Sequence, residues 1–154
     1  MTLNAEKYIK DMLDILSKQT VKPAEIIIAD SESTDKTIEI AKSYDLVKIL
    51  EIKRSEFDHG GSRHLAFDKS VGDFVLFFTQ DAIIEHKNYI EQIISNFADE
   101  KVAMVCGRQK AKPNAVHYER LIREFNYPMQ KKVRTSADIN TLGIKAFYMS
   151  DACS

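Results

Sequence analysis

The sequence contains little of what marks several protein classes. Its 154 residues include two cysteines, Cys106 and Cys153, three prolines, five glycines and no tryptophan. The two cysteines are far apart and lack the close spacing of zinc ligands, and no basic-then-apolar leader opens the chain. We therefore expect a cytoplasmic protein whose thiols stay reduced.

Long apolar runs and an excess of charge are also missing. No run reaches the roughly 20 apolar residues that span a bilayer, so we expect any membrane contact to be peripheral, at the inner face. Lysine and arginine number 22 against 23 acidic residues, which gives a net charge of −1. A chain without an overall positive field is not expected to bind nucleic acid.

Three nucleotide-binding or catalytic signatures are absent. The sequence has no G-x-G-x-x-G, no G-x-x-x-x-G-K-[ST] and no G-x-S-x-G. Neither a dinucleotide fold of the usual kind, nor a P-loop kinase, nor a serine hydrolase is therefore supported.

What the sequence does contain is an alternation of helix and strand patterns. With 44% apolar residues, the chain has enough for one packed core. Asn4 is predicted to cap a first helix that ends near Gln19, and Ser33 or Thr34 to cap a second. We predict further helices over about 60–70, 87–97 and 118–125, and strands over about 26–30, 47–52, 74–81 and 101–106. The order indicates an α/β layered domain with a mostly parallel sheet.

Two of these strands end in an aspartate, Asp30 and Asp81. In open α/β sheets, ligands bind outside the carboxyl ends of the strands. Two acids delivered there indicate a polar ligand together with a cation, and a nucleoside diphosphate with Mg²⁺ or Mn²⁺ meets that requirement.

Several motifs together resemble the family 2 glycosyltransferases of the GT-A fold, and most closely their bacterial rhamnosyltransferase-like branch. The resemblance rests on residues 4–9 with Gln19, 25–37, 57–63, 79–82, 107–109 and 125–128. It implies a GT-A-like three-layer α/β/α domain with a mostly parallel sheet, here incomplete. Residues 1–154 are expected to form a single partial domain, the part that binds the nucleotide-sugar donor.

The ends of the chain depart from the family pattern. Family members begin with a strand, but only three residues precede Asn4. The acidic segment that supplies the general base in inverting members is expected beyond Ser154, so the catalytic base is unknown. Turnover by this chain alone is not expected.

The resemblance assigns a nucleotide-sugar site to Asp30, Ser31, Arg63, Gln80 and Asp81. Asp30 would accept a hydrogen bond from the base, since a carboxylate is an acceptor. Arg63 would serve a phosphate near a helix start. Asp81 corresponds to the last acid of the family D-x-D motif and would bind the divalent cation, Mg²⁺ or Mn²⁺, with the diphosphate supplying other ligands.

Simpler roles stay open for several of these residues. Asp30 alone is equally typical of a turn or a helix cap. For Asp81, a cap on the following segment is the less favoured alternative, and Asp58 is more typical of a loop turn than of catalysis. His59 and His64 could suggest zinc, but no cysteine accompanies them at ligand spacing.

The stretch from Arg108 to Arg134 is locally basic, with eight lysines or arginines against two glutamates. Together with its aromatic residues, it could face a lipid-diphosphate acceptor or an anionic membrane. A solvated charged face is the ordinary alternative.

The resulting prediction is an enzyme that moves a sugar from a nucleotide diphosphate donor, with dTDP-rhamnose as a candidate, to a polysaccharide or lipid-linked acceptor with inversion. The alternative is a noncatalytic nucleotide-binding or interaction module that pairs with a second copy through an exposed sheet edge. A nucleotidyltransferase is a third class, but the chain lacks the glycine- and lysine- or arginine-rich phosphate loop that this class needs near its start.

Overall fold

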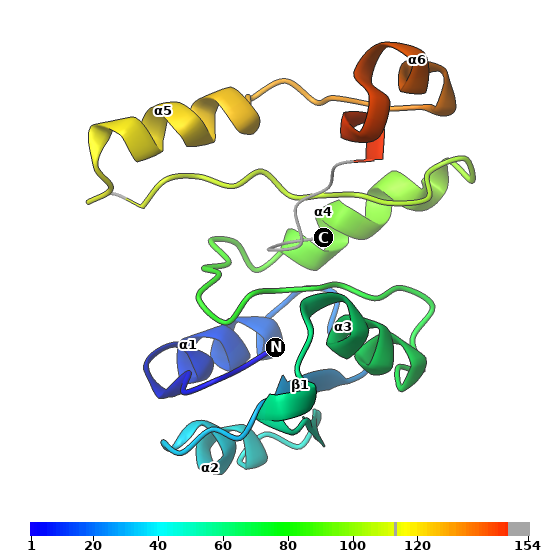
Figure 1. The fold of residues 1–154 in the computed structure, drawn as a ribbon. Helices are drawn as coiled ribbons and strands as arrows, with labels where there is room; N and C mark the ends of the chain where they lie inside the picture. Colours follow the sequence, from blue (N-terminus) through cyan, green and yellow to red (C-terminus); the bar gives the residue numbers. More distant parts are fainter. Residues whose placement is uncertain (113, 148–154) are drawn as a thin grey trace.

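The computed structural model describes residues 1–112 and 114–147, and its helices and strands alternate along the first half of the chain (Figure 1). In order, the helices are α1 (Glu6–Ser17), α2 (Thr37–Lys42), α3 (His59–Asp68), α4 (Tyr89–Ile94), α5 (His117–Asn126) and α6 (Ile139–Leu142), and the strands are β1 (Ile26–Asp30) and β2 (Val47–Glu51). Short 3₁₀ turns cover Arg54–Glu56, Ser95–Ala98, Ser136–Asp138 and Gly143–Phe147.

The sheet of the described chain is a parallel pair. β1 and β2 pair in register from Ile26 opposite Val47 to Asp30 opposite Glu51, and α2 lies in the connection between them. This confirms the predicted β-α-β unit. On the other edge of β1, Thr2 forms an isolated parallel bridge with Asp30.

The main core lies between α1, β1 and α2. Ile9 and Leu13 of α1 are at most 2% exposed and pack with Ile28 of β1 and Ala41 of α2. These positions follow the 3.6-residue period predicted for the first helix. Each buried aliphatic side chain contributes on the order of 1.5–3 kcal/mol to folding, so this cluster fixes the position of β1.

A second apolar cluster joins the end of α1 to the later part of the chain. It contains Leu16, Ile84 and Ile90, with Leu76 and Phe78 packed against them. The buried Gln19 supports the same junction, because its side chain donates to the His86 carbonyl at 3.0 Å and accepts from the Ile90 N–H at 3.0 Å.

Two predicted strands do not form. Residues 74–81 and 101–106 contain no strand. A strand needs a hydrogen-bonded neighbour, and a cavity separates residues 74–78 from β1. Phe78 is an isolated β-bridge residue within this stretch, and apolar packing places Leu76 and Phe78 in the second cluster. The apolar pattern therefore predicted burial correctly and a continuous strand wrongly.

The predicted helix caps were also wrong. α1 begins after Ala5 and α2 after Lys36, and neither of these residues caps with its side chain. The Asn4 side chain instead accepts from the Thr34 N–H at 2.9 Å, and the Ser33 hydroxyl donates to Asp30 at 2.6 Å. Bonds between the two loops replace local capping.

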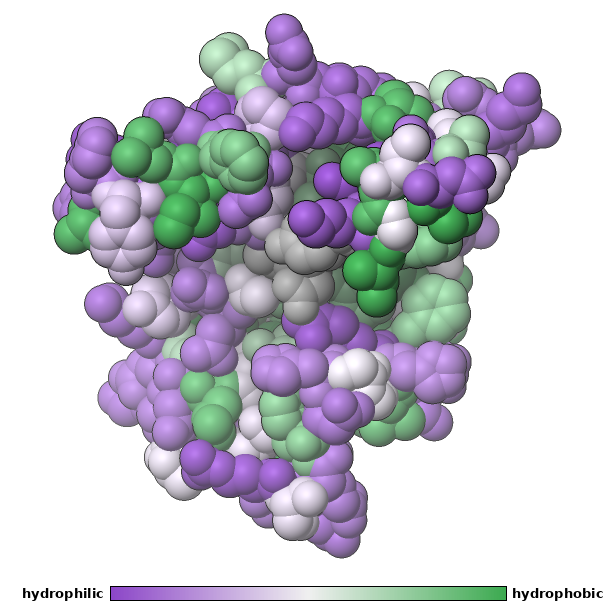
Figure 2. All heavy atoms as spheres, turned by 45° about the horizontal axis from the view of Figure 1, so that its top comes forward, coloured by the Kyte–Doolittle hydropathy of each residue, from purple (hydrophilic) through white to green (hydrophobic). Residues whose placement is uncertain are grey.

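The later helices are largely exposed. The helix predicted over 118–125 is confirmed as α5, but neither α5 nor α6 contains a buried residue. Figure 2 shows apolar side chains at the surface over α5. Leu121, Ile122 and Phe125 of this helix are exposed, and Phe125 is 83% exposed. None of the helices in the described ranges is long and apolar enough to cross a bilayer.

Candidate functional site

Asp30 closes a tight turn at the carboxyl end of β1. Its carboxylate accepts three hydrogen bonds, from the Ser33 N–H at 2.8 Å, the Ser33 hydroxyl at 2.6 Å and the Thr2 hydroxyl at 2.8 Å. The side chain is buried, with 3% exposed. Since a carboxylate offers about four acceptor positions, about one remains, so the turn role is present and the base-binding role stays a prediction.

The first three residues connect Asp30 to two other predicted site residues. The Ser31 N–H donates to the Thr2 carbonyl at 3.0 Å, and the Ser31 hydroxyl donates to the same carbonyl at 3.2 Å. The Leu3 N–H donates to the Gln80 side-chain oxygen at 2.9 Å. Asp30, Ser31 and Gln80 therefore gather around residues 1–3, although Gln80 is about fifty residues from the other two.

A set of reciprocal bonds holds the loop after β1 against the start of α1. The Ala5 N–H donates to the Thr37 hydroxyl at 2.7 Å, and the Glu6 N–H donates to the Asp35 carboxylate at 3.0 Å. The Lys36 N–H donates back to the Glu6 carboxylate at 3.2 Å. Burial raises the pKa of Asp35, but the bonds from Thr37 and Glu6 outweigh it and leave this pKa below its ordinary value.

Two residues beside this contact have a left-handed backbone. Asn4 has φ of 50° and Glu32 has φ of 62°. Asparagine adopts this region readily, whereas glutamate does so at a cost of about 1–2 kcal/mol. The Glu32 carboxylate accepts from the Arg54 N–H at 3.1 Å, which helps hold the turn.

Arg63 lies on α3, which begins after Asp58. The Asp58 side chain accepts from the Gly60 and Gly61 N–H groups and caps the helix. This cap confirms a local structural role for Asp58. Arg63 is partly buried, its guanidinium donates to the His59 carbonyl at 3.0 Å, and it lines the cavity that Gln80 also lines.

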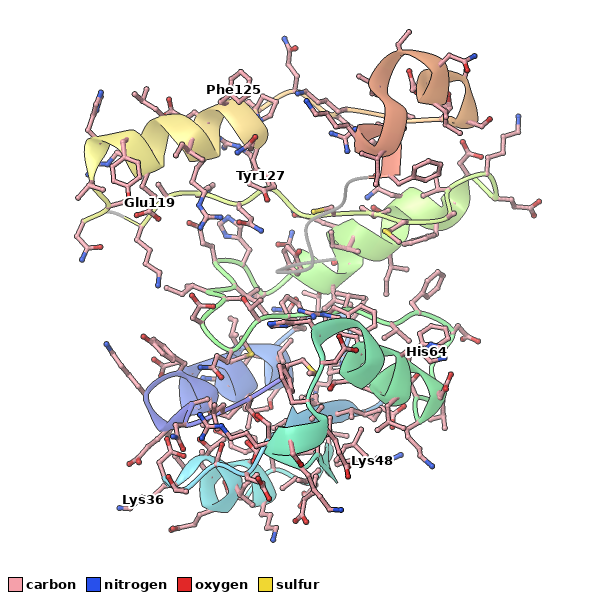
Figure 3. All side chains as sticks on the ribbon, viewed as in Figure 1. Lys36, Lys48, His64, Glu119, Phe125 and Tyr127 are labelled. Carbon is pink, nitrogen blue, oxygen red and sulfur yellow. The ribbon has the colours of Figure 1, made fainter. Side chains whose placement is uncertain are left out.

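The two histidines of this region have separate local contacts. The His59 ring packs edge-on against the Phe57 ring, with 5.1 Å between the ring centroids. His64 is exposed, points away from the body of the chain (Figure 3), and lies 3.6 Å from Asp68. Among the described residues, no three His, Cys, Asp or Glu side chains come together to hold an ion.

Asp81 is exposed in a turn closed by the Ala82 N–H and the Thr79 carbonyl at 3.1 Å. Within the described part of the chain, its carboxylate accepts no hydrogen bond and forms no ion pair. The helix-cap alternative therefore lacks a contact. An exposed single carboxylate next to Gln80 suits a cation that takes its remaining ligands from a diphosphate and water.

The Met1 amino group is partly buried beside this cluster. Burial and the nearby Arg63 guanidinium lower the pKa of the Met1 amino group, while Asp30 acts in the opposite direction. Asp30 and Arg63 are thus both close enough to this amine to influence it, which places Arg63 with the Asp30 cluster. Figure 1 shows the amino terminus between α1 and α3.

A second, basic hollow lies between residues 108–112 and α5, with a volume of about 350 Å³. The Arg108 side chain donates to the Tyr127 carbonyl at 2.9 Å, and the Arg123 side chain bonds the Gln109 side chain. In Figure 3, Tyr127 lies on the side of α5 that faces this segment and Phe125 points away. The two sequence motifs around 107–109 and 125–128 are therefore in contact.

Sequence reasoning missed the residues that support this site. Thr2 and Ser33 bond Asp30 directly, and Thr37 is fully buried beneath the loop. Thr2 and Asp30 are 28 residues apart, so no local pattern links them. The polar run 31–37 was the one available signal, since small hydroxyl side chains often bond nearby backbone groups.

Comparison with known proteins decides the family. The profile described as glycosyl transferase family 2 matches residues 1–154. The chain belongs to glycosyl transferase family 2. Enzymes of this family generally depend on divalent cations.

Two curated relatives are similar over most of this family 2 chain. It is 46% identical over 140 residues to the O-antigen chain rhamnosyltransferase WbaN of Salmonella anatum, covering 88% of this chain and 43% of the relative. It is 38% identical over 156 residues to the O-antigen chain rhamnosyltransferase RfbN of Salmonella typhimurium strain LT2, covering 98% of this chain and 48% of the relative. The chain thus spans less than half the length of either relative, and the predicted rhamnosyltransferase-like branch is confirmed.

A solved structure supports the fold of this family 2 chain. S. aureus TarS residues 1–349 match with a TM-score of 0.56 and 29% sequence identity, covering 73% of this chain and 36% of that one. The predicted GT-A-like α/β fold class is confirmed.

Proposed function

We propose that this chain is the donor-binding part of an enzyme that transfers a sugar from a nucleoside diphosphate to a carbohydrate acceptor. The observation that carries the proposal is the match of the family 2 profile over the whole chain. The gathering of Asp30, Ser31 and Gln80 around residues 1–3, with Arg63 nearby, supports it. The similarity to two O-antigen chain rhamnosyltransferases favours a rhamnose donor and an acceptor in O-antigen assembly. In this proposal the donor is dTDP-rhamnose and the transfer proceeds with inversion.

Each residue has a role in this proposal. The remaining acceptor position on Asp30 takes the imide N–H of the base, Ser31 adds a hydroxyl beside it, and the Arg63 guanidinium binds a phosphate. Asp81 is the candidate oxygen ligand for Mg²⁺ or Mn²⁺, which lowers the charge of the departing diphosphate when it is bound. Gln80 contacts the nucleotide sugar beside it.

The acceptor in this proposal is carried on a lipid at the inner face of the membrane. The basic hollow supports this reading, because Arg108, Lys110, Lys112 and Arg120 line it and an anionic diphosphate is their natural counterpart. The exposed apolar side chains of α5 lie on the adjoining helix.

Calorimetric titration tests the donor site. We expect dTDP or UDP to bind the purified chain more tightly with Mn²⁺ than without it, and Asp81→Asn to remove this metal dependence. Glu100→Gln, which changes another exposed acid, serves as the control. Absence of nucleotide binding to a folded chain would favour a noncatalytic interaction module, and unchanged metal dependence in Asp81→Asn would exclude Asp81 as the metal ligand.

A further inference from the structure

The basic hollow beside α5 shares one of its cations with the loop that carries Asp81. The lining of the hollow includes five lysines or arginines and one glutamate. One of these cations, the Lys110 ammonium group, forms an ion pair with the Glu85 carboxylate at 2.5 Å. Glu85 lies outside the hollow, four residues after Asp81. The ion pair therefore links the segments that the proposed function assigns to the donor and to the acceptor.

Contacts on either side of Glu85 hold its backbone in place. Ile84 is 9% exposed and belongs to the second apolar cluster. The His86 carbonyl accepts a hydrogen bond at 3.0 Å from the side chain of Gln19, which is itself buried. Lys110, in contrast, lies in residues 102–112, which contain no helix or strand. Glu85 therefore presents its carboxylate from a fixed position to a lysine on an irregular segment.

Positive groups surround the Glu85 carboxylate. The hydrogen bond from Lys110 lowers the pKa of Glu85 below its ordinary value, and His86 and Arg108 act in the same direction. The His86 Nε2 atom lies 3.7 Å from the carboxylate oxygen that Lys110 contacts. Lys110 and Arg108 both line the hollow. Glu85 thus supplies, from outside the hollow, a negative charge beside two of its cations.

The ion pair is exposed, so an anionic ligand can replace it at little cost. The side chains of Lys110 and Glu85 are 52% and 49% exposed. Exposed ion pairs contribute little to stability, and salt weakens them further. A diphosphate carries more negative charge than a carboxylate and accepts charge-assisted hydrogen bonds from several cations at once. Such a group in the hollow would therefore displace Glu85 from Lys110.

We propose that Glu85 competes with the acceptor diphosphate for Lys110 and holds this lysine until the diphosphate binds. The inference rests on the proposed acceptor site and deepens it, because it names the contact that the ligand must break. Glu85 is a positioning residue in this scheme, since it acts through Lys110 and does not touch the ligand. Its removal should strengthen the binding of a diphosphate in the hollow.

Titration with inorganic pyrophosphate in metal-free buffer tests the proposal. The amide chemical shifts of residues 108–112 report binding in the hollow, whereas shifts of residues 60–63 report binding at the donor site. We expect Glu85→Gln to bind pyrophosphate in the hollow about threefold more tightly than the parent chain, as the loss of an exposed ion pair allows. Glu100→Gln removes an exposed negative charge elsewhere and should leave this affinity unchanged.

A double substitution separates competition for Lys110 from a simple change of net charge. If Glu85 acts through Lys110, the gain in affinity from Glu85→Gln should disappear when it is made in Lys110→Gln. Lys110→Gln alone should weaken the binding of pyrophosphate, because it removes one of the cations of the hollow.

Each other outcome overturns the proposal. An equal gain from Glu85→Gln with and without Lys110 would show that only the net charge matters. An unchanged affinity in Glu85→Gln would show that its carboxylate does not compete for the lysine. If pyrophosphate shifted no amide of residues 108–112 in any variant, the hollow would not be a diphosphate site, and the acceptor part of the proposed function would fail with it. The donor part is tested separately by dTDP.

Discussion

The Thr2 hydroxyl donates a hydrogen bond to the Asp30 carboxylate at 2.8 Å, and both side chains are buried. The bond joins the first residues of the chain to the end of β1. It holds the carboxylate that is proposed to bind the nucleotide base, so the geometry of the proposed donor site depends on a residue with no predicted role.

Replacing this hydroxyl should destabilise the fold. Thr2→Val keeps the shape but removes the donor, and a hydrogen bond to a charged group is worth about 1.5–3 kcal/mol. We expect the free energy of unfolding, measured in urea, to fall by an amount in this range.

Thr20→Val is the matched control for this substitution. The Thr20 hydroxyl also donates to a carboxylate, that of Glu91, at 2.8 Å, but the pair is exposed. We expect a change below about 0.5 kcal/mol. An equal decrease in the free energy of unfolding in the two variants would show that the buried Thr2–Asp30 bond stabilises the fold no more than an exposed one.

The glycine pair at the start of α3 gives a second prediction. A Cβ added at Gly61 would lie 2.6 Å from an Asp58 carboxylate oxygen, whereas at Gly60 the distance would be 3.8 Å. Gly61→Ala should displace the Asp58 side chain and lose its cap, at a cost of about 0.5–2 kcal/mol in thermal unfolding. Gly60→Ala should be neutral or slightly stabilising. A larger loss of stability in Gly60→Ala than in Gly61→Ala would contradict the observed cap.

The pH dependence of stability should reflect Glu25. The ion pair with Lys48 at 2.8 Å, followed by the bond from the Val71 N–H at 2.6 Å, lowers the pKa of Glu25 from its ordinary value of 4.5. The unfolded chain therefore binds the proton first as the pH falls. This contribution to stability is complete above about pH 4.5, the ordinary pKa of glutamate. It is lost as the pH falls through the lower pKa that Glu25 has in the folded state.

Glu25→Gln removes that contribution. We expect the variant to unfold more easily than the parent at pH 7 and to lose less stability between pH 5 and pH 3, by denaturant titration at each pH. Glu39→Gln changes an exposed glutamate of α2 and should leave the pH profile unchanged. A parallel profile for Glu25→Gln would show that other carboxylates carry the acid sensitivity.

Arg63 should affect ligand affinity more than stability. A guanidinium–phosphate hydrogen bond is charge-assisted, and its loss at about 1.5 kcal/mol corresponds to roughly tenfold weaker binding. We expect Arg63→Gln to weaken dTDP binding by about that factor in calorimetry. Lys69→Gln, at the other end of α3, should leave the affinity for dTDP unchanged. Equal affinities in the two variants would show that Arg63 does not bind the nucleotide.

Exposed apolar residues of α5 lead to a membrane prediction. Phe125 is 83% exposed, and arginines lie on the same helix. If α5 lies at an anionic surface, Phe125→Ser should reduce co-sedimentation with phosphatidylglycerol vesicles. Phe67→Ser, at an exposed position of α3, is the control; equal loss in both would indicate nonspecific adsorption.

Sequence patterns predicted the elements whose partners are close along the chain. The apolar period of α1, the strand β1 and the glycine start of α3 all appear near their predicted bounds. Residues 74–81 have an equally strong strand pattern, but strand formation depends on a paired neighbour, which a local pattern cannot reveal. Asn4 has the right propensity for a cap, yet its side chain bonds Thr34, thirty residues away.

For the candidate site, the sequence indicated which residues belong together but not the contacts that they make. Asp30 and Arg63 are partly or fully buried near residues 1–3, and Gln80 bonds Leu3, as their grouping in one site requires. Sequence did not show that two neighbours already occupy most of the Asp30 carboxylate, because those bonds come from a turn and from a distant segment.

The reciprocal bonds between the start of α1 and the loop before α2 change where this chain should begin to come apart. Helix ends normally fray first, since their initial N–H groups lack partners. Here the Ala5, Glu6 and Thr37 N–H groups all bond side chains of the two loops. Melting should therefore spread from α5 and α6, which bury no residue, and the half of the chain with β1 should be the last to lose its structure.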